Sequence, residues 1–294
     1  MARAVEVPGA VEARSAQREV SRPRPWPGTL ITGALVVGMF ALLAAVGPWV
    51  VPYDVEKFHR ADALQPPSAK YWFGTDRYGR DIFSRVLVGS RTTMVMAVTG
   101  TTLGLLVGVL IGVVSGYLGG LVDEALMRTM DVAMSFPALL LALLVVAVLG
   151  ANVTNAVLSI GIVFAPRVAR VVRSATLALR SAEFVEAAQV RGESGTYIIF
   201  REILPNLWPP IIVETSIRLS YAVLLTVSLS YLGLGSQPPT PDWGLMVSKE
   251  RAFLSLAPWV VLFPAGAIVT LILGVNLLGD GLRYRLVSRK SLDA

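Results

Sequence analysis

Residues 183–206 read "EFVEAAQVRGESGTYIIFREILPN" and lie between two apolar runs, 153–172 and 209–234. The stretch carries seven ionisable side chains in 24 residues, counting its tyrosine. Charged side chains are costly inside the hydrocarbon of a membrane, so we expect this stretch to lie outside it. A membrane protein that keeps such a segment between two apolar runs presents it to water or to a partner.

Capping residues predict that this stretch folds as a hairpin of two short helices. Ser181 is a candidate N-cap for the first helix, and Gly192 is placed to end it in a left-handed conformation. Ser194 or Thr196 would cap the second helix, and Pro205 would limit it. The prediction is therefore helix, glycine turn, helix.

Small and apolar residues beside the charges favour a partner-binding segment. The pair Ala187 and Ala188 offers a surface that a partner could approach closely. The apolar run 197–200 would not be needed in a fully solvated loop, although it could rest on the membrane surface. Both interpretations, a docking segment and a loop lying on the membrane, agree with these residues.

The composition beyond this stretch predicts an all-α polytopic membrane protein. The 294 residues are 54% hydrophobic and only 16% charged, with a mean hydropathy of +0.64, and whole stretches are apolar on every helical face. Six runs can span a membrane, the third only if it borrows from the amphipathic stretch before Pro137. The six runs are 29–51, 92–114, 136–151, 153–172, 209–234 and 256–279.

The first run could be read as a cleaved signal peptide, since Ala45-Val46-Gly47 loosely resembles a cleavage site. Its apolar stretch exceeds the usual core of about 7–15 residues in a signal peptide, and further spans follow, so we favour an uncleaved helix. Six spans place both termini on one side of the membrane.

The distribution of basic residues predicts which side that is. Sixteen Lys and Arg residues lie on the side of the termini and nine on the other, which predicts cytoplasmic termini. Seven of the nine fall between spans one and two, where Arg77, Arg80, Arg85 and Arg91 could follow an amphipathic helix.

The predicted division of the chain is a disordered tail (1–28), a transmembrane helix (29–51), an external loop with the amphipathic segment (52–91), a five-helix core (92–282) containing loop 174–207, and a C-terminal tail (283–294).

A glycine stripe marks the second span. Glycine recurs there at every fourth residue, a spacing that keeps it on one helix face and allows another helix to approach closely. Packing within the chain is the favoured interpretation, and a contact with another subunit is the alternative. The stripe consists of Gly100, Gly104, Gly108, Gly112 and Gly116.

The fifth span contains a candidate ion pair, Glu214 and Arg218, at positions i and i+4. Charges inside a membrane commonly mark a translocation pathway. Because Glu214 lies only about 9 Å into the span, pairing of the two side chains with each other near the interface is the favoured alternative.

Enzymatic chemistry finds no support in the residues. A phosphate-binding Walker A loop needs Gly-Lys before Ser or Thr, and the lysine that precedes a serine, Lys290, follows Arg289. The single histidine, His59, lies in a polar loop, where a solvated side chain is expected, and Asp76 and Asp81 have no nucleophile beside them. The chain has no cysteine, so we predict no thiolate metal site and no enzyme.

Residues 186–206 resemble the "EAA" loop of the permease subunits of bacterial ABC importers. Glu186-Ala187-Ala188, then three residues, then Gly192, and finally Leu204-Pro205-Asn206 match that pattern, between spans four and five of six. The resemblance implies the type I importer fold and a cytosolic coupling helix that docks on an ATPase. The residues implied in coupling are Glu183, Glu186, Ala187, Ala188, Arg191, Gly192, Leu204 and Pro205.

Three further stretches are similar to the dipeptide, oligopeptide and nickel branch of these importers. They read "FGTDRYGRDIFSRVLVGSR" (73–91), "RTMDVAMSFPALLLAL" (128–143) and "YLGLGSQPPTPDWGLM" (231–246). Together they indicate the C-type subunit of two paralogous permeases. Glu202, where a basic or apolar residue would be expected, and the ending after "LGDGLR" (278–283) depart from the pattern.

The resemblance implies partners for the chain in the bacterial plasma (inner) membrane. They are a paralogous permease, two ATP-binding subunits that carry ATP and Mg²⁺, an external substrate-binding protein and membrane lipid, with no nucleic acid. The stiff loop with Pro238, Pro239 and Pro241 is expected to present Asp242 and Trp243 to the binding protein, and membrane anchoring of the tryptophan is the alternative. Di- or oligopeptides are the favoured cargo; nickel, glutathione and opines are alternatives.

Two other classes of membrane protein remain to be compared. A secondary transporter would show internal repeats and broken helices, and no repeat relates 29–151 to 153–279. A non-transporting scaffold would explain the glycine stripe but not the charged hairpin.

Overall fold

The computed structural model describes residues 28–290, with side chains through Arg285; residues 1–27 of the predicted N-terminal tail and 291–294 of the predicted C-terminal tail lie outside it. Apart from one isolated bridge between Thr75 and Asp81, the regular structure of the described residues is helical, as the sequence predicted. The long helices are α2 (Gly28–Val50), α3 (Ile82–Leu118), α4 (Gly120–Ser135), α5 (Ala138–Leu149), α6 (Val153–Arg180), α10 (Trp208–Tyr231) and α12 (Trp259–Lys290).

Within the described residues, five helices are long and apolar enough to cross a membrane, namely α2, α3, α6, α10 and α12. The sixth crossing differs from the prediction because its two halves, α4 and α5, meet at a bend of 94°. Phe136 is extended (φ −87°, ψ 138°) before Pro137, as the ring of a following proline demands. The twelve residues of α5 rise only about 18 Å, so this crossing needs both halves.

The segment between α2 and α3 also differs from the prediction. No separate amphipathic helix carries its arginines: Arg77 and Arg80 lie in the loop, whereas Arg85 and Arg91 belong to α3. The helix begins ten residues before the predicted start at residue 92 because Asp81 caps it, accepting a hydrogen bond from the Ser84 amide at 2.8 Å. Helix α12 continues past the predicted boundary at 283 to Lys290, so the predicted C-terminal tail begins within a helix.

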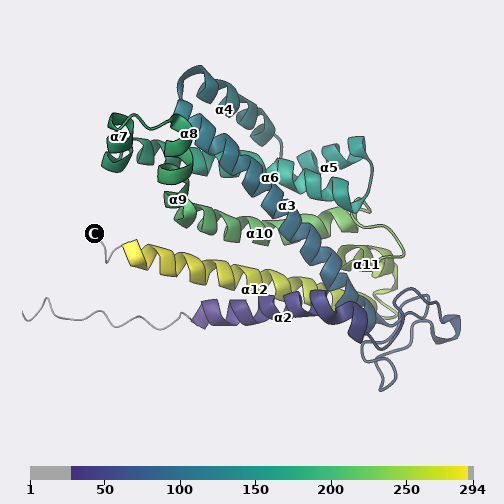
Figure 1. Ribbon diagram of the computed structural model, residues 1–294. Helices are drawn as coiled ribbons and strands as arrows, with labels where there is room; N and C mark the ends of the chain where they lie inside the picture. The colour runs from purple at the N-terminus through teal and green to yellow at the C-terminus, as the bar shows by residue number, and fades with distance from the viewer. Residues whose placement is uncertain (1–27, 291–294) are drawn as a thin grey trace, which may run out of the picture.

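The glycine stripe of α3 lies against α6 (Figure 1). A Cβ atom added at any of the five glycines would lie 2.5–2.8 Å from an atom of α6, closer than real Cβ atoms approach. Glycine is therefore required at this helix crossing, and the stripe serves packing within the chain. Helix α2 meets α12 in the same way, where a Cβ on Gly33 would lie 2.2 Å from the Leu278 amide nitrogen.

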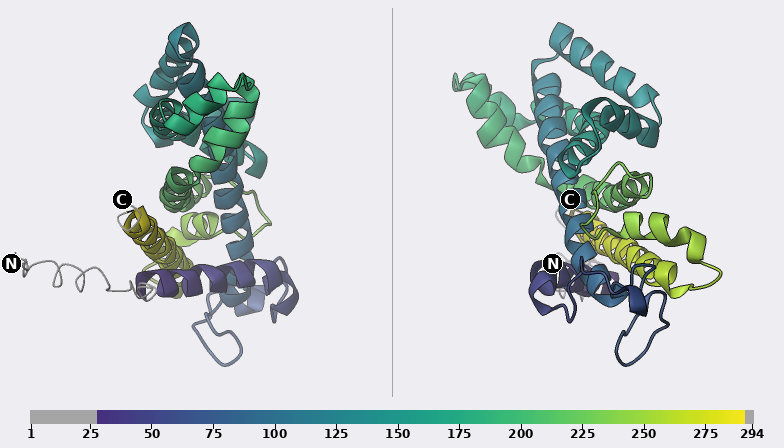
Figure 2. Two further views of the ribbon diagram at one scale, coloured as in Figure 1. Left: turned by 60° about the vertical axis from the view of Figure 1, so that its left-hand side comes forward. Right: turned by 90° about the vertical axis from the view of Figure 1, so that its right-hand side faces the viewer.

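The hairpin 183–206 and the loop before α3 lie at opposite ends of the molecule. In Figure 1, α7 (Glu183–Val190), the start of α2 and the end of α12 lie toward the left, whereas α11 (Trp243–Glu250) and the loop before α3 lie toward the right. Helices α4 to α8 (Gly195–Tyr197) stand on the side of the molecule opposite α2 (Figure 2). We call the end with α7 the hairpin end, after residues 183–206, and the end with α11 the loop end.

Candidate functional site

The hairpin consists of α7 (Glu183–Val190), a glycine turn and a second helical run. Ala182, not Ser181, precedes α7, without a side-chain cap. Gly192 is left-handed (φ +79°) as predicted, and its amide donates to the Gln189 carbonyl at 2.9 Å. Ser194 caps the second run by accepting from the Tyr197 amide at 3.2 Å. Sequence signals thus located the turn and the second helix start.

The second helical run does not stop at Pro205. It passes from α8 (Gly195–Tyr197) through a π-helical segment, Ile198–Ile203, into α9 (Leu204–Asn206), and α10 follows at Trp208. Pro205 stands in the first turn of α9. Leu204 is half-buried beneath the hairpin and Pro205 is exposed.

One side of α7 packs against the chain itself. Val185 and Ala188 are both 0% exposed, and they belong to a buried cluster with Val168, Val172, Ile198, Ile203 and Leu207. The prediction that Ala188 faces a partner is therefore wrong. Successive helical residues point about 100° apart, so Ala188 can point into the buried cluster while Ala187 beside it is exposed.

The other side of α7 is open. Glu183, Glu186, Ala187 and Val190 are exposed, and their positions fall within an arc of about 100° on the helix. We call these four residues the coupling face. Val190, at 89% exposure, was missed by sequence reasoning, although its place three residues after Ala187 was the available signal.

Arg191 lies within the hairpin rather than on the coupling face. Its guanidinium is 3.7 Å from Glu193 and 3.6 Å from Glu202, so Glu202, the unexpected residue of the motif, connects the two helical runs. Because the arginine side chain is 54% exposed, these pairs contribute little stability. They orient the turn more than they strengthen it.

The strained turn leads to a testable prediction. Gly192→Val should weaken the hairpin by about 1–2 kcal/mol, because a side chain in the left-handed region clashes with its own backbone. Nothing lies within 4 Å of a Cβ at this position, so the cost is conformational and not a collision with neighbours. Gly192→Asn should recover most of the loss. Hydrogen exchange of the 183–206 amides would measure the stability of the hairpin in both variants. Equal protection in the two would contradict a cost that comes from the left-handed backbone.

Ion pairs join α4 to α6 beside the hairpin. Arg173 donates to Asp123, which also accepts from Ser115, and Arg170 donates to Asp131. These partners lie 50 and 39 positions apart in the sequence, so spacing gave no signal for them. They hold the bent crossing against α6 around an open hollow of about 520 Å³.

Glu214 and Arg218 pair with each other. The Arg218 Nε donates to Glu214 Oε1 at 2.5 Å, and both side chains are nearly buried. The guanidinium also lies 5.9 Å from the centre of the Phe164 ring. This arrangement agrees with the self-pairing alternative, because the pair is satisfied inside the chain and lines none of the hollows described here.

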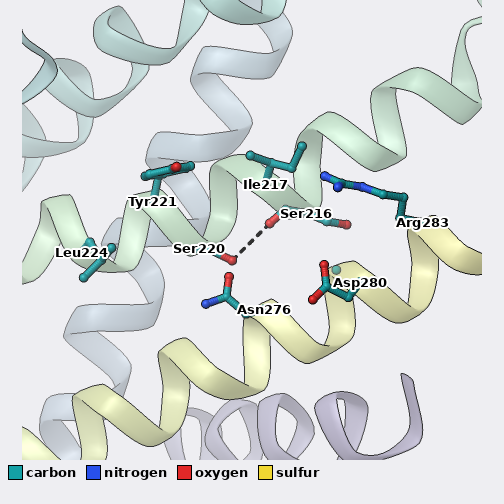
Figure 3. Close-up of a pocket in the computed structure, with 9 residues that line it drawn as sticks. Ser216, Ile217, Ser220, Tyr221, Leu224, Asn276, Asp280 and Arg283 are labelled. Carbon is teal, nitrogen blue, oxygen red and sulfur yellow. Dashed lines mark hydrogen bonds between the residues drawn. The ribbon is translucent and has the colours of Figure 1, made fainter. Parts of the chain in front are cut away.

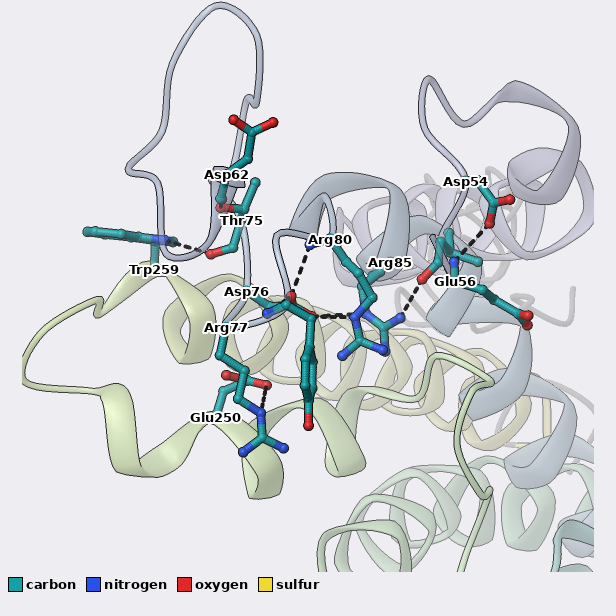
Figure 4. Close-up of polar contacts among 12 residues, drawn as sticks. Asp54, Glu56, Asp62, Thr75, Asp76, Arg77, Arg80, Arg85, Glu250 and Trp259 are labelled. Carbon is teal, nitrogen blue, oxygen red and sulfur yellow. Dashed lines mark hydrogen bonds and ion pairs between the residues drawn. The ribbon is translucent and has the colours of Figure 1, made fainter. Parts of the chain in front are cut away.

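A charged cluster closes the loop end (Figure 4). Arg80 donates to Asp76 at 2.7 Å, Arg85 donates to the Val55 carbonyl at 2.6 Å, and Arg77 lies 3.4 Å from Glu250 of α11 (Trp243–Glu250). Burial raises the pKa of Glu250, and the nearby Asp76 carboxylate raises it further. The cluster ties the loop before α3 to α11.

Asp242 and Trp243 are buried, so the prediction that they contact a binding protein is wrong. Trp243 is 0% exposed and its indole donates to the Val86 carbonyl at 2.9 Å. Asp242 caps α11 by accepting from the Leu245 amide at 3.0 Å, and it also accepts from Ser230 at 3.0 Å. The proline-rich loop suggested that both residues are exposed. Instead, Asp242 caps the start of α11, and Trp243 fixes this helix against α3. The exposed part of this loop is 237–240.

Burial raises the pKa of Asp242 above its ordinary value near 3.8, which leads to a prediction. A carboxyl with a raised pKa in the folded state destabilises the fold when it is ionised, so the wild type loses stability as the pH rises from 3.8 through the folded-state pKa. Asp242→Asn should be more stable than the wild type at neutral pH, because it removes the buried charge and because asparagine also caps helices.

This advantage of Asp242→Asn should vanish as the pH falls to 3.8. Thermal unfolding in detergent between pH 4 and pH 8 would measure it. Asp242→Ala, which removes the cap, is the matched control and should be less stable throughout. A pH-independent difference between Asp242→Asn and the wild type would contradict the prediction.

A polar groove lies between α10 and α12 (Figure 3). Its volume is about 330 Å³, and it is lined by Ser216, Ile217, Ser220, Tyr221, Leu224, Asn276, Gly279, Asp280 and Arg283. Sequence reasoning missed it because the polar residues of α12 are spread singly through an apolar run. Only the pairing of α10 with α12 gathers them.

The described residues contain no group of three or more His, Cys, Asp or Glu side chains arranged to hold a metal ion. The candidate features are the coupling face at the hairpin end, the charged cluster at the loop end, and the groove between α10 and α12.

Comparison with known proteins agrees with this arrangement. Residues 108–291 match the family described as binding-protein-dependent transport system inner membrane component. The chain is 41% identical to the dipeptide transport system permease protein DppC of Alkalihalophilus pseudofirmus, over 86% of this chain and 83% of that protein. It is 47% identical to the glutathione transport system permease protein GsiD of Salmonella typhimurium, over 86% and 84%.

The fold is similar to a chain of the inward-facing MetNI methionine ABC transporter, with a TM-score of 0.57, 18% identity, and coverage of 69% of this chain and 96% of that chain. This confirms the predicted type I importer permease fold, and the family match and the relatives confirm the resemblance seen in the sequence. The family consists of permeases that are not enzymes in themselves. The chain belongs to the family of inner-membrane permease components of binding-protein-dependent ABC transport systems.

Proposed function

We propose that this chain is the C-type permease of a peptide importer, working beside a paralogous permease, two ATP-binding subunits and an external binding protein. The observation that carries the proposal is the coupling face, an exposed and partly apolar surface on a rigidly packed helix. The names of the relatives support dipeptides or glutathione, both amide-containing solutes, as cargo. ATP and Mg²⁺ would be bound by the partner subunits.

The arrangement of the two ends suggests how the subunit works. The hairpin end would face the cytosol, together with both termini, and the loop end would face the binding protein. Because Val185 and Ala188 anchor α7 in the buried cluster with α6, a movement of a docked ATPase would shift α7 and α6 together. Such a rigid-body movement can switch the pathway between outward- and inward-facing states.

Reconstitution tests this function. The chain, co-expressed with its paralogous permease and ATP-binding subunits, should purify as one complex, and vesicles containing it should take up dialanine only with ATP and binding protein. Uptake that persists without ATP and follows an ion gradient would instead identify a secondary transporter. ATP-dependent uptake of glutathione but not dialanine would retain the importer and change its cargo.

A further inference from the structure

The groove between α10 and α12 holds polar side chains that no neighbour satisfies. Within residues 28–285, the side chains of Asn276, Asp280 and Arg283 make no hydrogen bond or ion pair, and Asn276 and Asp280 are exposed. Ser220 reaches only the Ser216 carbonyl, at 3.4 Å. Figure 3 shows Ser220, Asn276 and Asp280 pointing toward the space between the two helices.

The position of these groups makes lipid an unfavourable environment for them. Ser220 lies about 18 Å along α10 from Trp208, half the length of the helix, and Asn276 lies about 26 Å along α12 from Trp259. Both positions fall within segments long enough to span a membrane. An unsatisfied amide facing hydrocarbon costs several kcal/mol, so water, solute or another protein chain must cover it.

The open face of α12 changes character along its length. Toward the loop end it presents Leu262, Val269 and Leu273, which are 55–61% exposed. Toward the hairpin end the same face continues with Asn276 and Asp280. The apolar part suits lipid or a partner helix, whereas the polar part needs hydrogen-bond partners.

We infer that this groove is a peptide-contacting segment of the translocation pathway, from mid-membrane to the hairpin end. Asn276 offers two donors and an acceptor and Ser220 offers a hydroxyl, which match the amide groups that every peptide backbone carries. Asp280 and Arg283 have opposite charges, so they suit both the ammonium and the carboxylate ends of a peptide. A volume near 330 Å³ is at the lower end of the roughly 300–1,000 Å³ of small-ligand sites. This inference rests on the proposed importer function.

The absence of cysteine from the chain makes accessibility measurable. Single variants Asn276→Cys and Leu224→Cys, in the assembled complex in vesicles, would be treated with a water-soluble, charged methanethiosulfonate. Leu110→Cys is the matched control, since this leucine is 64% exposed on α3 but stands in an apolar stretch. The groove thiols should react at least ~10-fold faster than the control, because the thiolate is the reactive form and does not form in hydrocarbon. Dialanine with binding protein and ATP should slow the groove reaction.

Uptake provides a second readout. Asn276→Leu should reduce dialanine uptake by about fivefold to tenfold, the factor that corresponds to one hydrogen bond, while the ATP-binding subunits still co-purify. Leu110→Ala should leave uptake unchanged.

Groove thiols that react in the isolated subunit but not in the complex would assign the face to the paralogous permease and overturn the inference. Equally slow reaction of groove and control thiols would assign it to lipid and overturn it too. Wild-type vesicles that import dialanine would preserve the proposed function in either case, whereas wild-type vesicles that fail to do so would reject that function first.

Discussion

Ala187→Trp is expected to abolish peptide uptake while the subunit remains folded and inserted. Ala187 is exposed on the coupling face, one helical turn from both Glu183 and Val190, so an indole there would hold a docking partner away without touching the buried cluster beneath α7. Loss of an important interface contact typically costs about 2–4 kcal/mol, or roughly 30–1,000-fold in affinity. Uptake of dialanine by reconstituted vesicles, with co-purification of the ATP-binding subunits, would measure the effect.

Two controls separate docking from folding. Gln189→Trp introduces the same side chain at an exposed position on α7 that points about 160° away from Ala187, and it should transport almost normally. Ala188→Trp inserts the ring at a position with 0% exposure and should destabilise the hairpin itself. If Ala187→Trp and Gln189→Trp transport equally well, the coupling face is not the docking surface.

Gly108→Leu is expected to prevent stable assembly of the bundle. A Cβ at Gly108 would lie 2.5 Å from the Val168 Cβ and 2.7 Å from the Ala165 carbonyl oxygen. Overpacking usually costs about 1–3 kcal/mol, and the cost here should reach or exceed the upper end because a backbone atom of α6 would have to move. The yield of folded protein in the membrane and its unfolding temperature in detergent would measure the loss.

Gly38→Leu is the matched control for that change. It makes the same substitution in another spanning helix, at a position with nothing within 4 Å of the added Cβ. Its stability should remain close to that of the wild type. Equal losses of stability in the two variants would indicate that leucine acts through helix propensity or membrane insertion and not through the contact between α3 and α6.

The sequence by itself determined the class of fold and the location of its charged hairpin, residues 183–206. Apolar run length is a local property that water and hydrocarbon enforce on each segment separately, so the spans could be recognised one by one. The turn at Gly192 was equally local, because only glycine enters the left-handed region without cost. The four-residue spacing of the glycines on α3 predicted a close helix contact for the same reason.

Only the tertiary structure decided which side chains face outward. Ala188 and Trp243 looked available in the sequence, yet both are fully buried, because burial depends on segments that pack from elsewhere in the chain. The partners of Asp123 and Asp131 lie 50 and 39 positions away, and the groove between α10 and α12 exists only where two distant helices meet. A sequence fixes the chemistry of each residue and its local geometry, whereas its neighbours, and thus its function, depend on how helices remote in the chain cross.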